Sequence, residues 1–341
     1  MTKVLVADPL HKVGQDLLLQ EVEIEVATGL SEDELISRIG LYAGLVVRSE
    51  TQVTRAVLQA GANLKVVARA GVGVDNIDLE AATDLGIAVV NAPTGNTVAA
   101  AEHTVALLLA LVRNIPQSYQ SLQAKEWRRN QFIGVEVRHK VLGVAGLGKV
   151  GTEVARRARG LEMKVIGYDP FVSQEYASRL GVDLVSKEEL LSQADFITLH
   201  LPFTPTTENF LDAASLKLVK KNVRILNVAR GGLVDEGALF AALEDDRVAG
   251  AGLDVFQSEP PSDYTLINHP RVIATPHLGA STEEAQEEVA REAVAQLLMV
   301  LRGEPAPYTV NASFAAPRPE GILQAYVGLA SLVGKLAVQL S

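Results

Sequence analysis

The chain has 341 residues, 48% of them hydrophobic, and its 31 basic and 41 acidic residues give a formal charge of −10. The length predicts two domains. The negative charge argues against nucleic acid as a partner, because phosphate binding needs a positive surface. No cysteine is present, which excludes disulfides, thiol catalysis and thiolate metal sites. No apolar run reaches the roughly 18 residues of a membrane span, so no membrane partner is expected.

The first part of the chain alternates between short apolar runs and helical patterns. We expect strands over 3–7, 45–47, 65–68 and 87–90. A helix is predicted over 31–40, where Ser31 and Glu34 have the spacing of a capping box. A longer apolar helix is predicted from about residue 98 to 112, with Thr97 as its cap.

A second series of the same kind follows. It contains six predicted strands, at 141–145, 164–168, 196–200, 224–227, 250–253 and 272–274, and three helices, at 150–159, 187–193 and 236–244. A final long helix opens at Ser281 and runs to about Arg302. We therefore expect an α/β protein with two doubly wound parallel sheets. Residues 97–284 would be inserted into a discontinuous domain made of 1–96 and 285–314. A linker and a short helix would follow over 315–341.

The predicted strand at 141–145 leads into Gly146, Gly148 and Gly151, spaced as Gly-x-Gly-x-x-Gly at the start of a helix. Such glycines permit a tight turn, close approach of a pyrophosphate and close helix packing, while the helix N-terminus attracts the anion. The next strand ends in Asp169. A carboxylate there accepts hydrogen bonds from both ribose hydroxyls, and its negative charge repels a 2′-phosphate. The pattern predicts NAD, rather than NADP, as cofactor.

Three later segments follow predicted strands and supply one arginine, one carboxylate and one histidine. We assign His277 as acid and base, Glu259 as the group that orients its ring, and Arg230 as the clamp on a substrate carboxylate. Each also has a plain structural interpretation, as a packed histidine, a loop acid or a solvated arginine. His200 is the nearest rival among the other histidines, which are at positions 11, 103, 139, 200 and 269.

Four segments carry a resemblance to a known family. They are Gly-Leu-Gly-Lys-Val-Gly from Gly146, Asn-Val-Ala-Arg-Gly-Gly-Leu-Val-Asp-Glu from Asn227, Leu-Asp-Val-Phe-x-x-Glu-Pro-Pro from Leu253 and Pro-His-Leu-Gly-Ala-Ser-Thr from Pro276. The chain resembles the D-isomer-specific 2-hydroxyacid dehydrogenases over about residues 1–310. The resemblance implies a flavodoxin-like substrate domain, a Rossmann NAD-binding domain, and a homodimer formed through the Rossmann domain, with a tetramer as the alternative.

The resemblance also implies two sets of binding residues and no metal. The cofactor set is Val72, Gly146, Gly148, Lys149, Val150, Gly151, Asp169, His200, Leu201, Val228, Ala229, Arg230, Asp254, His277, Gly279 and Ala280. The substrate set is Arg48, Ser49, Arg69, Val72, Gly73, Asn96, Arg230 and His277. Trp127, Arg128 and Arg129 match an insertion that reaches the neighbouring subunit in relatives. Val72 and Leu201 depart from the small polar residue and the threonine that are frequent in the family.

Within the family, the resemblance is greatest to members that oxidise 3-phosphoglycerate to 3-phosphohydroxypyruvate at the entry to serine synthesis. A glyoxylate or hydroxypyruvate reductase, or another D-2-hydroxyacid dehydrogenase, is the enzymatic alternative. An NAD(H)-sensing protein similar to corepressors of this fold is the non-enzymatic one. We expect a cytoplasmic protein, with an organelle as the alternative. Longer relatives continue into regulatory domains, so the sequence is either a short form or a shortened chain.

Overall fold

The computed structural model describes residues 2–312, 326, 329–330 and 332–334. The chain divides into two compact units. Unit 1 contains Met1–Gly95 and Glu283–Ser341, and unit 2 contains Asn96–Thr282. The predicted boundaries, after residues 96 and 284, lie one and two residues further along the chain. Most of the linker and helix predicted over 315–341 lies outside the described residues.

Unit 1 is built on a five-stranded parallel sheet. Its strands are β1 (Lys3–Val6), β2 (Glu23–Val26), β3 (Gly44–Val47), β4 (Val66–Arg69) and β5 (Ala88–Asn91). They are paired in the order β2-β1-β3-β4-β5. This is the flavodoxin-like order, which confirms the fold expected for this part of the chain. The edge strand β2 was not predicted, because its alternating glutamates leave it mostly exposed.

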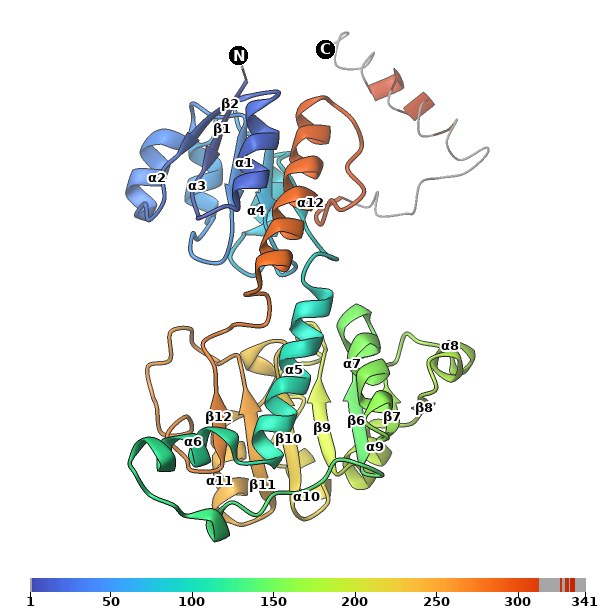
Figure 1. Ribbon diagram of the computed structural model, residues 1–341. Coiled ribbons are helices and arrows are strands. Elements are labelled where there is room, and N and C mark those ends of the chain that lie inside the picture. Colours follow the sequence, from blue (N-terminus) through green and yellow to red (C-terminus); the bar gives the residue numbers. More distant parts are fainter. Residues whose placement is uncertain (1, 313–325, 327–328, 331, 335–341) are drawn as a thin grey trace. The chain divides into compact units, whose positions relative to one another are not determined.

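Two layers of helices cover this sheet (Figure 1). On one face, α1 (Lys12–Leu19) and the returning α12 (Glu283–Leu301) pack against β-strand valines. On the other face lie α2 (Glu32–Ile39), α3 (Arg55–Ala60) and α4 (Leu79–Asp84). The capping box predicted at Ser31 and Glu34 is present at the start of α2. The return of α12 makes this domain discontinuous in sequence, as expected.

Unit 2 is built on a seven-stranded parallel sheet. Its strands are β6 (Val141–Ala145), β7 (Lys164–Tyr168), β8 (Asp183–Leu184), β9 (Phe196–Leu199), β10 (Val223–Asn227), β11 (Val248–Leu253) and β12 (Val272–Ala274). Their order is β12-β11-β10-β9-β6-β7-β8. The order reverses between β6 and β9, as in a Rossmann fold extended by one strand. Successive strand residues alternate between the two faces, so each face has its own apolar core.

The helices of unit 2 again form two layers. Packed against one core are α5 (Thr97–Val112) and α7 (Lys149–Gly160), and against the other are α9 (Lys187–Gln193), α10 (Ser215–Leu218) and α11 (Glu236–Glu244). The remaining helices are α6 (Ile115–Gln123), α8 (Gln174–Arg179) and 3₁₀ turns at Arg129–Gln131 and Gly231–Leu233. The prediction that Thr97 caps α5 is wrong. Asn96 holds the N-cap position without a side-chain cap bond, and Thr97 is already helical.

Among the described residues, no single helix combines the length and apolar composition of a membrane span. Within this part of the chain, α5 and α6 meet that criterion when taken together, and the pair is bent by 62°.

Candidate active site

The carboxyl ends of the parallel strands in unit 2 meet at one edge of the sheet, where open α/β sheets bind ligands. All predicted cofactor residues in unit 2 follow one of these ends. Gly146, Gly148, Lys149, Val150 and Gly151 follow β6, Asp169 follows β7, His200 and Leu201 follow β9, Val228, Ala229 and Arg230 follow β10, Asp254 follows β11, and His277, Gly279 and Ala280 follow β12. Val72 belongs to unit 1.

The glycine turn after β6 is shaped by close backbone contacts. Gly146 has a φ of 94°, and a Cβ there would lie 2.4 Å from the carbonyl oxygen of His200. A Cβ on Gly151 would lie 1.9 Å from the carbonyl oxygen of Gly146, so the first turn of α7 packs directly on the loop. A Cβ on Gly148 would meet nothing within 4 Å, which leaves space in front of the helix N-terminus. This cradle fits the pyrophosphate of a dinucleotide.

Asp169, at the end of β7, is hydrogen-bonded to the glycine turn. Its Oδ2 accepts a hydrogen bond from the backbone N–H of Leu147 at 2.9 Å, and its Oδ1 accepts one from the N–H of Phe171, also at 2.9 Å. A carboxylate is thereby fixed at the end of β7, beside the glycine turn. Its place and charge fit an adenosine ribose better than a 2′-phosphate.

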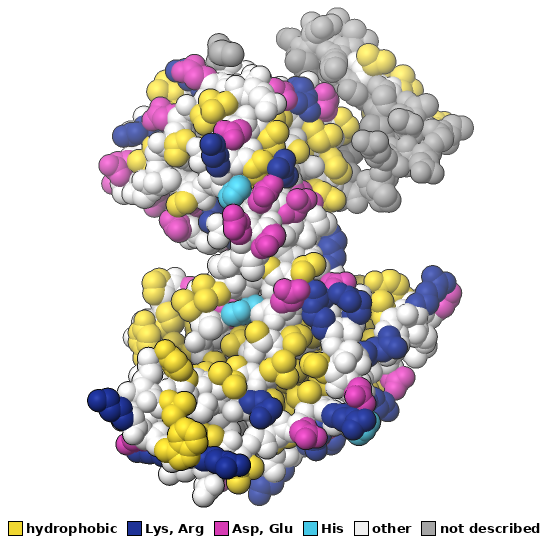
Figure 2. Space-filling model, in the orientation of Figure 1, with side chains coloured by type: hydrophobic (Ala, Val, Ile, Leu, Met, Phe, Trp, Pro, Cys, Tyr) yellow, Lys and Arg dark blue, Asp and Glu magenta, His cyan; other side chains and the backbone are white. Residues whose placement is uncertain are grey.

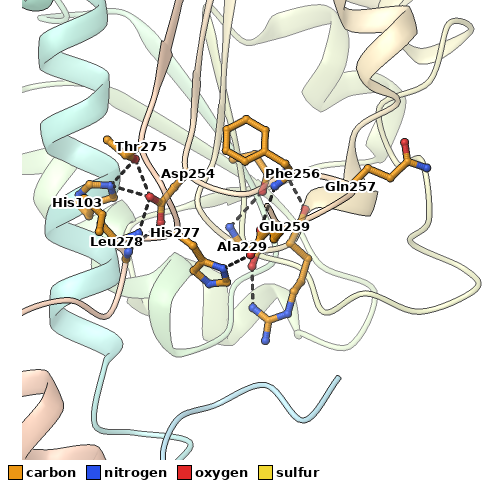
Figure 3. Close-up of polar contacts among 12 residues, drawn as sticks. His103, Ala229, Asp254, Phe256, Gln257, Glu259, Thr275, His277 and Leu278 are labelled. Carbon is orange, nitrogen blue, oxygen red and sulfur yellow. Dashed lines mark hydrogen bonds and ion pairs between the residues drawn. The ribbon is translucent and has the colours of Figure 1, made fainter. Parts of the chain in front are cut away.

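His277 and Glu259 form a hydrogen-bonded pair (Figure 3). His277 Nδ1 lies 2.6 Å from Glu259 Oε2, and Glu259 Oε1 accepts from the backbone N–H of Phe256 at 3.0 Å. Burial raises the pKa of Glu259, but the bonds from His277 and Phe256 outweigh it and leave that pKa below its usual value. Since the ionised carboxylate can only accept, Nδ1 carries a proton, and Nε2 of the neutral ring can accept one. Both side chains line a pocket of about 410 Å³.

The backbone that carries His277 is strained and held by one buried carboxyl residue. His277 has a φ of 54°, a left-handed conformation that is uncommon outside glycine. Its N–H donates to the carbonyl oxygen of Asp254 at 2.8 Å. The next two N–H groups donate to the Asp254 carboxylate, Leu278 to Oδ1 at 2.7 Å and Gly279 to Oδ2 at 2.8 Å. Three consecutive amides therefore donate to Asp254, whose side chain is fully buried.

The turn that carries Arg230 is fixed by Asn227, which is buried at the end of β10. The Asn227 side chain accepts from the N–H of Ala229 at 3.1 Å and donates to the carbonyl oxygen of Arg230 at 2.7 Å. The Arg230 guanidinium donates to the carbonyl oxygen of Ala229 at 2.7 Å. A Cβ on Gly231 would lie 1.9 Å from the Phe256 carbonyl oxygen, so this turn lies directly against the Glu259 loop. The loops that carry all three predicted catalytic residues are thus in mutual contact.

The rival histidine, His200, has a different environment. Its Nε2 lies 2.9 Å from Thr198 Oγ1, and burial lowers its pKa to about 3. Burial therefore opposes the imidazolium that a histidine base must become when it takes a proton from a hydroxyl group. The His200 ring also contacts no carboxylate in the described hydrogen-bond network. His277 is the better candidate for proton transfer.

Unit 1 places the predicted substrate residues at the carboxyl ends of its own strands. Arg48 and Ser49 follow β3, and their loop is held by buried Asp8, which accepts from the Arg48 N–H at 2.5 Å and the Thr51 hydroxyl at 2.5 Å. The Asn76 side chain donates to the carbonyl oxygens of Arg48 and Thr51 at 2.8 and 2.7 Å. A rigid loop thus presents one basic side chain at this edge of the sheet.

Arg69 ends β4 and precedes the loop that contains Val72 and Gly73. A Cβ on Gly71 would lie 1.7 Å from the Arg69 guanidinium, so the side chain lies over that glycine. The Asn91 side chain donates to the carbonyl oxygen of Val72 at 2.7 Å and holds the loop to β5. Asn96 is the first residue of unit 2, and no described residue makes a hydrogen bond with its buried Oδ1.

Sequence reasoning missed the residues that hold these loops. Asp8, Asn76 and Asn91 were assigned no role, and Asp254 was assigned only to the cofactor. The signal for Asp8 was its position two residues after the buried strand β1, which is similar to the position that identified Asp169 after β7. For the side chains that reach across from other elements, no local pattern exists.

Comparisons with known proteins agree with this geometry. The family model described as "D-isomer specific 2-hydroxyacid dehydrogenase, NAD binding domain" matches residues 105–279. The crystal structure of the TT0316 protein from Thermus thermophilus is 36% identical with a TM-score of 0.83, covering 91% of this chain and 100% of that one. A glyoxylate reductase from Paecilomyes thermophila is 30% identical with a TM-score of 0.83, covering 91% and 98%.

Among curated sequences, D-3-phosphoglycerate dehydrogenase from Synechocystis is 49% identical over 341 residues, which is 100% of this chain and 62% of that protein. D-3-phosphoglycerate dehydrogenase 2 from Arabidopsis thaliana is 49% identical over 99% of this chain and 55% of its own length. The chain therefore spans about three fifths of the length of these relatives. With the glycine turn, the His277–Glu259 pair and the family match together, the chain belongs to the D-isomer-specific 2-hydroxyacid dehydrogenases.

Proposed function

We propose that this protein oxidises D-3-phosphoglycerate to 3-phosphohydroxypyruvate with NAD. The observation that carries the proposal is the His277–Glu259 pair, at the strand edge of a domain that matches an NAD-binding family. The choice of substrate is supported by the relatives named D-3-phosphoglycerate dehydrogenase, which align with nearly the whole of this chain. A place in serine synthesis and a cytoplasmic location belong to the same proposal.

The proposed reaction removes a hydride from C2 and a proton from the hydroxyl on that carbon. NAD, when bound, is the acceptor of the hydride. Nε2 of His277 takes the hydroxyl proton as the carbonyl forms, and Glu259 stabilises the resulting positive charge through Nδ1–H. The lowered pKa of Glu259 keeps its carboxylate ionised for this task at neutral pH. Arg230 would bind the substrate carboxylate with its planar guanidinium.

The residues that would hold NAD are those of the strand edge. The glycine turn and the N-terminus of α7 suit the pyrophosphate, and Asp169 suits the ribose hydroxyls. The members of the predicted cofactor set from His200 to Ala280 follow β9 to β12 and would line the nicotinamide end.

Arg48 and Arg69 are the proposed partners of the substrate phosphate, together with Arg128 or Arg129 of a second subunit. Arginine suits this task because its charge is permanent and its fork matches phosphate oxygens. The loop that contains Val72 and Gly73 would bind the substrate carboxylate through backbone N–H groups. Asn76 holds the loop of Arg48 and Asn91 holds the loop of Val72, which supports their role as a preformed site.

The proposed assembly is a homodimer formed through unit 2. Trp127 is 82% exposed and lies with Leu122, Phe132 and Arg129 around a groove of about 340 Å³ beside α6. Figure 2 shows hydrophobic side chains over the α5 and α6 face of this unit, with basic side chains near its edge. Exposed apolar surface of this kind is typical of protein interfaces.

One alternative activity is also supported by a comparison. The solved structure of a glyoxylate reductase, which is 30% identical, is similar to 91% of this chain. A reductase of that type would need no arginines for a phosphate, so comparing turnover of 3-phosphoglycerate with that of D-glycerate separates the two functions.

Replacing His277 with Asn should lower turnover by about 10²–10⁴-fold while NADH binding is kept, because the acid/base group is lost. Asparagine tolerates a left-handed backbone, so the loop should survive. His139→Asn is the matched control, since His139 also has a positive φ of 60° but lies on the surface away from the strand edge. Turnover by His277→Asn at the rate of the control would remove His277 from the proposed mechanism.

Replacing Arg69 or Arg48 with Leu should raise KM for 3-phosphoglycerate by about 10- to 100-fold, the cost of a hydrogen-bonded charge pair. KM for unphosphorylated D-glycerate should not change. Arg55→Leu, which removes an exposed arginine paired with Asp84, controls for the loss of charge in the same unit. Equal turnover of glycerate and 3-phosphoglycerate by the unaltered protein would favour the reductase alternative.

Replacing Asp169 with Ala or Asn should weaken the binding of NAD and reduce the discrimination against NADP. The discrimination is measured as the ratio of kcat/KM for the two cofactors. The Asn variant keeps an acceptor for the Leu147 N–H and isolates the effect of charge. If both variants kept the original ratio, cofactor preference would be determined elsewhere in the site.

Replacing Trp127 with Glu should convert the proposed dimer into monomers, detected by sedimentation or light scattering. Phe171→Glu is the control, because Phe171 is another exposed aromatic of unit 2, at 95% exposure. A dimer that survives Trp127→Glu at low micromolar concentration would place the interface on another surface.

A further inference from the structure

A second histidine–carboxylate contact lies directly behind the His277 loop. His103 projects from α5, and its Nε2 lies 3.2 Å from Asp254 Oδ1 and 3.0 Å from Thr275 Oγ1. The Thr275 hydroxyl lies 2.6 Å from the same Asp254 oxygen. Figure 3 shows the side chains of His103 and Thr275 beside Asp254, on the side away from Glu259. The three residues come from three separate segments: His103 from α5, Asp254 from the end of β11 and Thr275 from the end of β12.

The hydrogen positions in this cluster follow from which groups can donate. Asp254 is held ionised: burial raises its pKa, but hydrogen bonds from His103, Thr275 and Leu278 outweigh burial and lower it. An ionised carboxylate only accepts, so the single hydroxyl proton of Thr275 is directed at Asp254. The Thr275 oxygen can then only accept from His103. Nε2 of His103 therefore carries a proton shared between Thr275 and Asp254.

The orientation of the Asp254 carboxylate matters because of what it holds. Each oxygen accepts a different backbone amide, Oδ1 from Leu278 and Oδ2 from Gly279. Rotation of the carboxylate would release one or both amides. These bonds hold His277 in a left-handed backbone conformation, which is strained for a residue other than glycine. The side chains that fix the carboxylate thereby fix the loop.

We propose that His103 is a positioning residue for the reaction: it locks the Asp254 carboxylate, and through it the backbone that aims His277 at the substrate. The inference rests on the proposed function for its kinetic consequence, but not for its structural one. His103 itself contacts neither Glu259 nor His277 in the described hydrogen-bond network. Its influence passes through Asp254 and Thr275.

Two substitutions separate the hydrogen bond from the bulk of the ring. His103→Leu removes the donor, whereas His103→Gln can place an amide N–H near the position of Nε2. His269→Gln is the matched control, because buried His269 also contacts a carboxylate, Glu244, at 3.1 Å, but lies outside the His277 network. Thr275→Val removes the hydroxyl that links His103 to Asp254, and serves if His103→Leu does not fold.

The first readout is hydrogen exchange over residues 275–282, which does not depend on activity. We expect faster exchange in His103→Leu and Thr275→Val, and near-normal exchange in His103→Gln and His269→Gln. The second readout is turnover per NADH-binding site. It should fall by about 10- to 100-fold in His103→Leu, the effect expected of a misplaced catalytic group. KM for NADH should change little, and His103→Gln should recover most of the rate.

The outcomes are distinguishable. Unchanged exchange over 275–282 in His103→Leu and Thr275→Val overturns the inference. So does an equal loss of turnover in His269→Gln, which would indicate a general effect on packing. If the unaltered protein reduces no 2-oxo acid, the proposed function fails, and the exchange data alone then decide the role of His103.

Discussion

The site depends on one constraint, the need to hold an imidazole on a backbone that L-amino acids disfavour. Asp254 meets it with three acceptor positions, its carbonyl oxygen and both carboxylate oxygens, each matched to one of three successive N–H groups. Burying a carboxylate is costly unless it is hydrogen-bonded. Here the donors that compensate for burial are the same amides whose positions must be fixed, so the charge and the loop stabilise each other.

This arrangement follows from the sheet beneath it. Parallel strands bring their carboxyl ends to one edge, and the residue after each strand is the first that can leave the core. The side chains of Asn227, Asp254 and Thr275 occupy such positions or lie next to them. Asn227 and Asp254 bond to backbone of their own or a neighbouring loop, and Thr275 donates to the Asp254 carboxylate. Arg230 and His277 come later in those loops, where side chains are more exposed. The sheet thus separates the residues that hold the site from those proposed to react.

Much of this could be predicted from local pattern. The alternation of strands and helices, the glycine turn and the Ser31 capping box depend on neighbours in sequence, and each was found where expected. The edge strand β2 was missed because Glu23 and Glu25 give it little apolar character. The pairing of His103 with Asp254 could not be predicted, because the two are 151 residues apart. Asp254 was singled out as a cofactor residue, yet its hold on the His277 loop depends on contacts that only the fold creates.

The most direct test of the account is the protonation of His277 itself. Nuclear magnetic resonance of protein labelled with ¹⁵N-histidine reports which ring nitrogen carries the proton. The account predicts that, once the ring is neutral, Nδ1 is protonated toward Glu259 and Nε2 is bare, and that Glu259→Gln disturbs this preference. A neutral ring with the proton on Nε2, unaffected by Glu259→Gln, would contradict it.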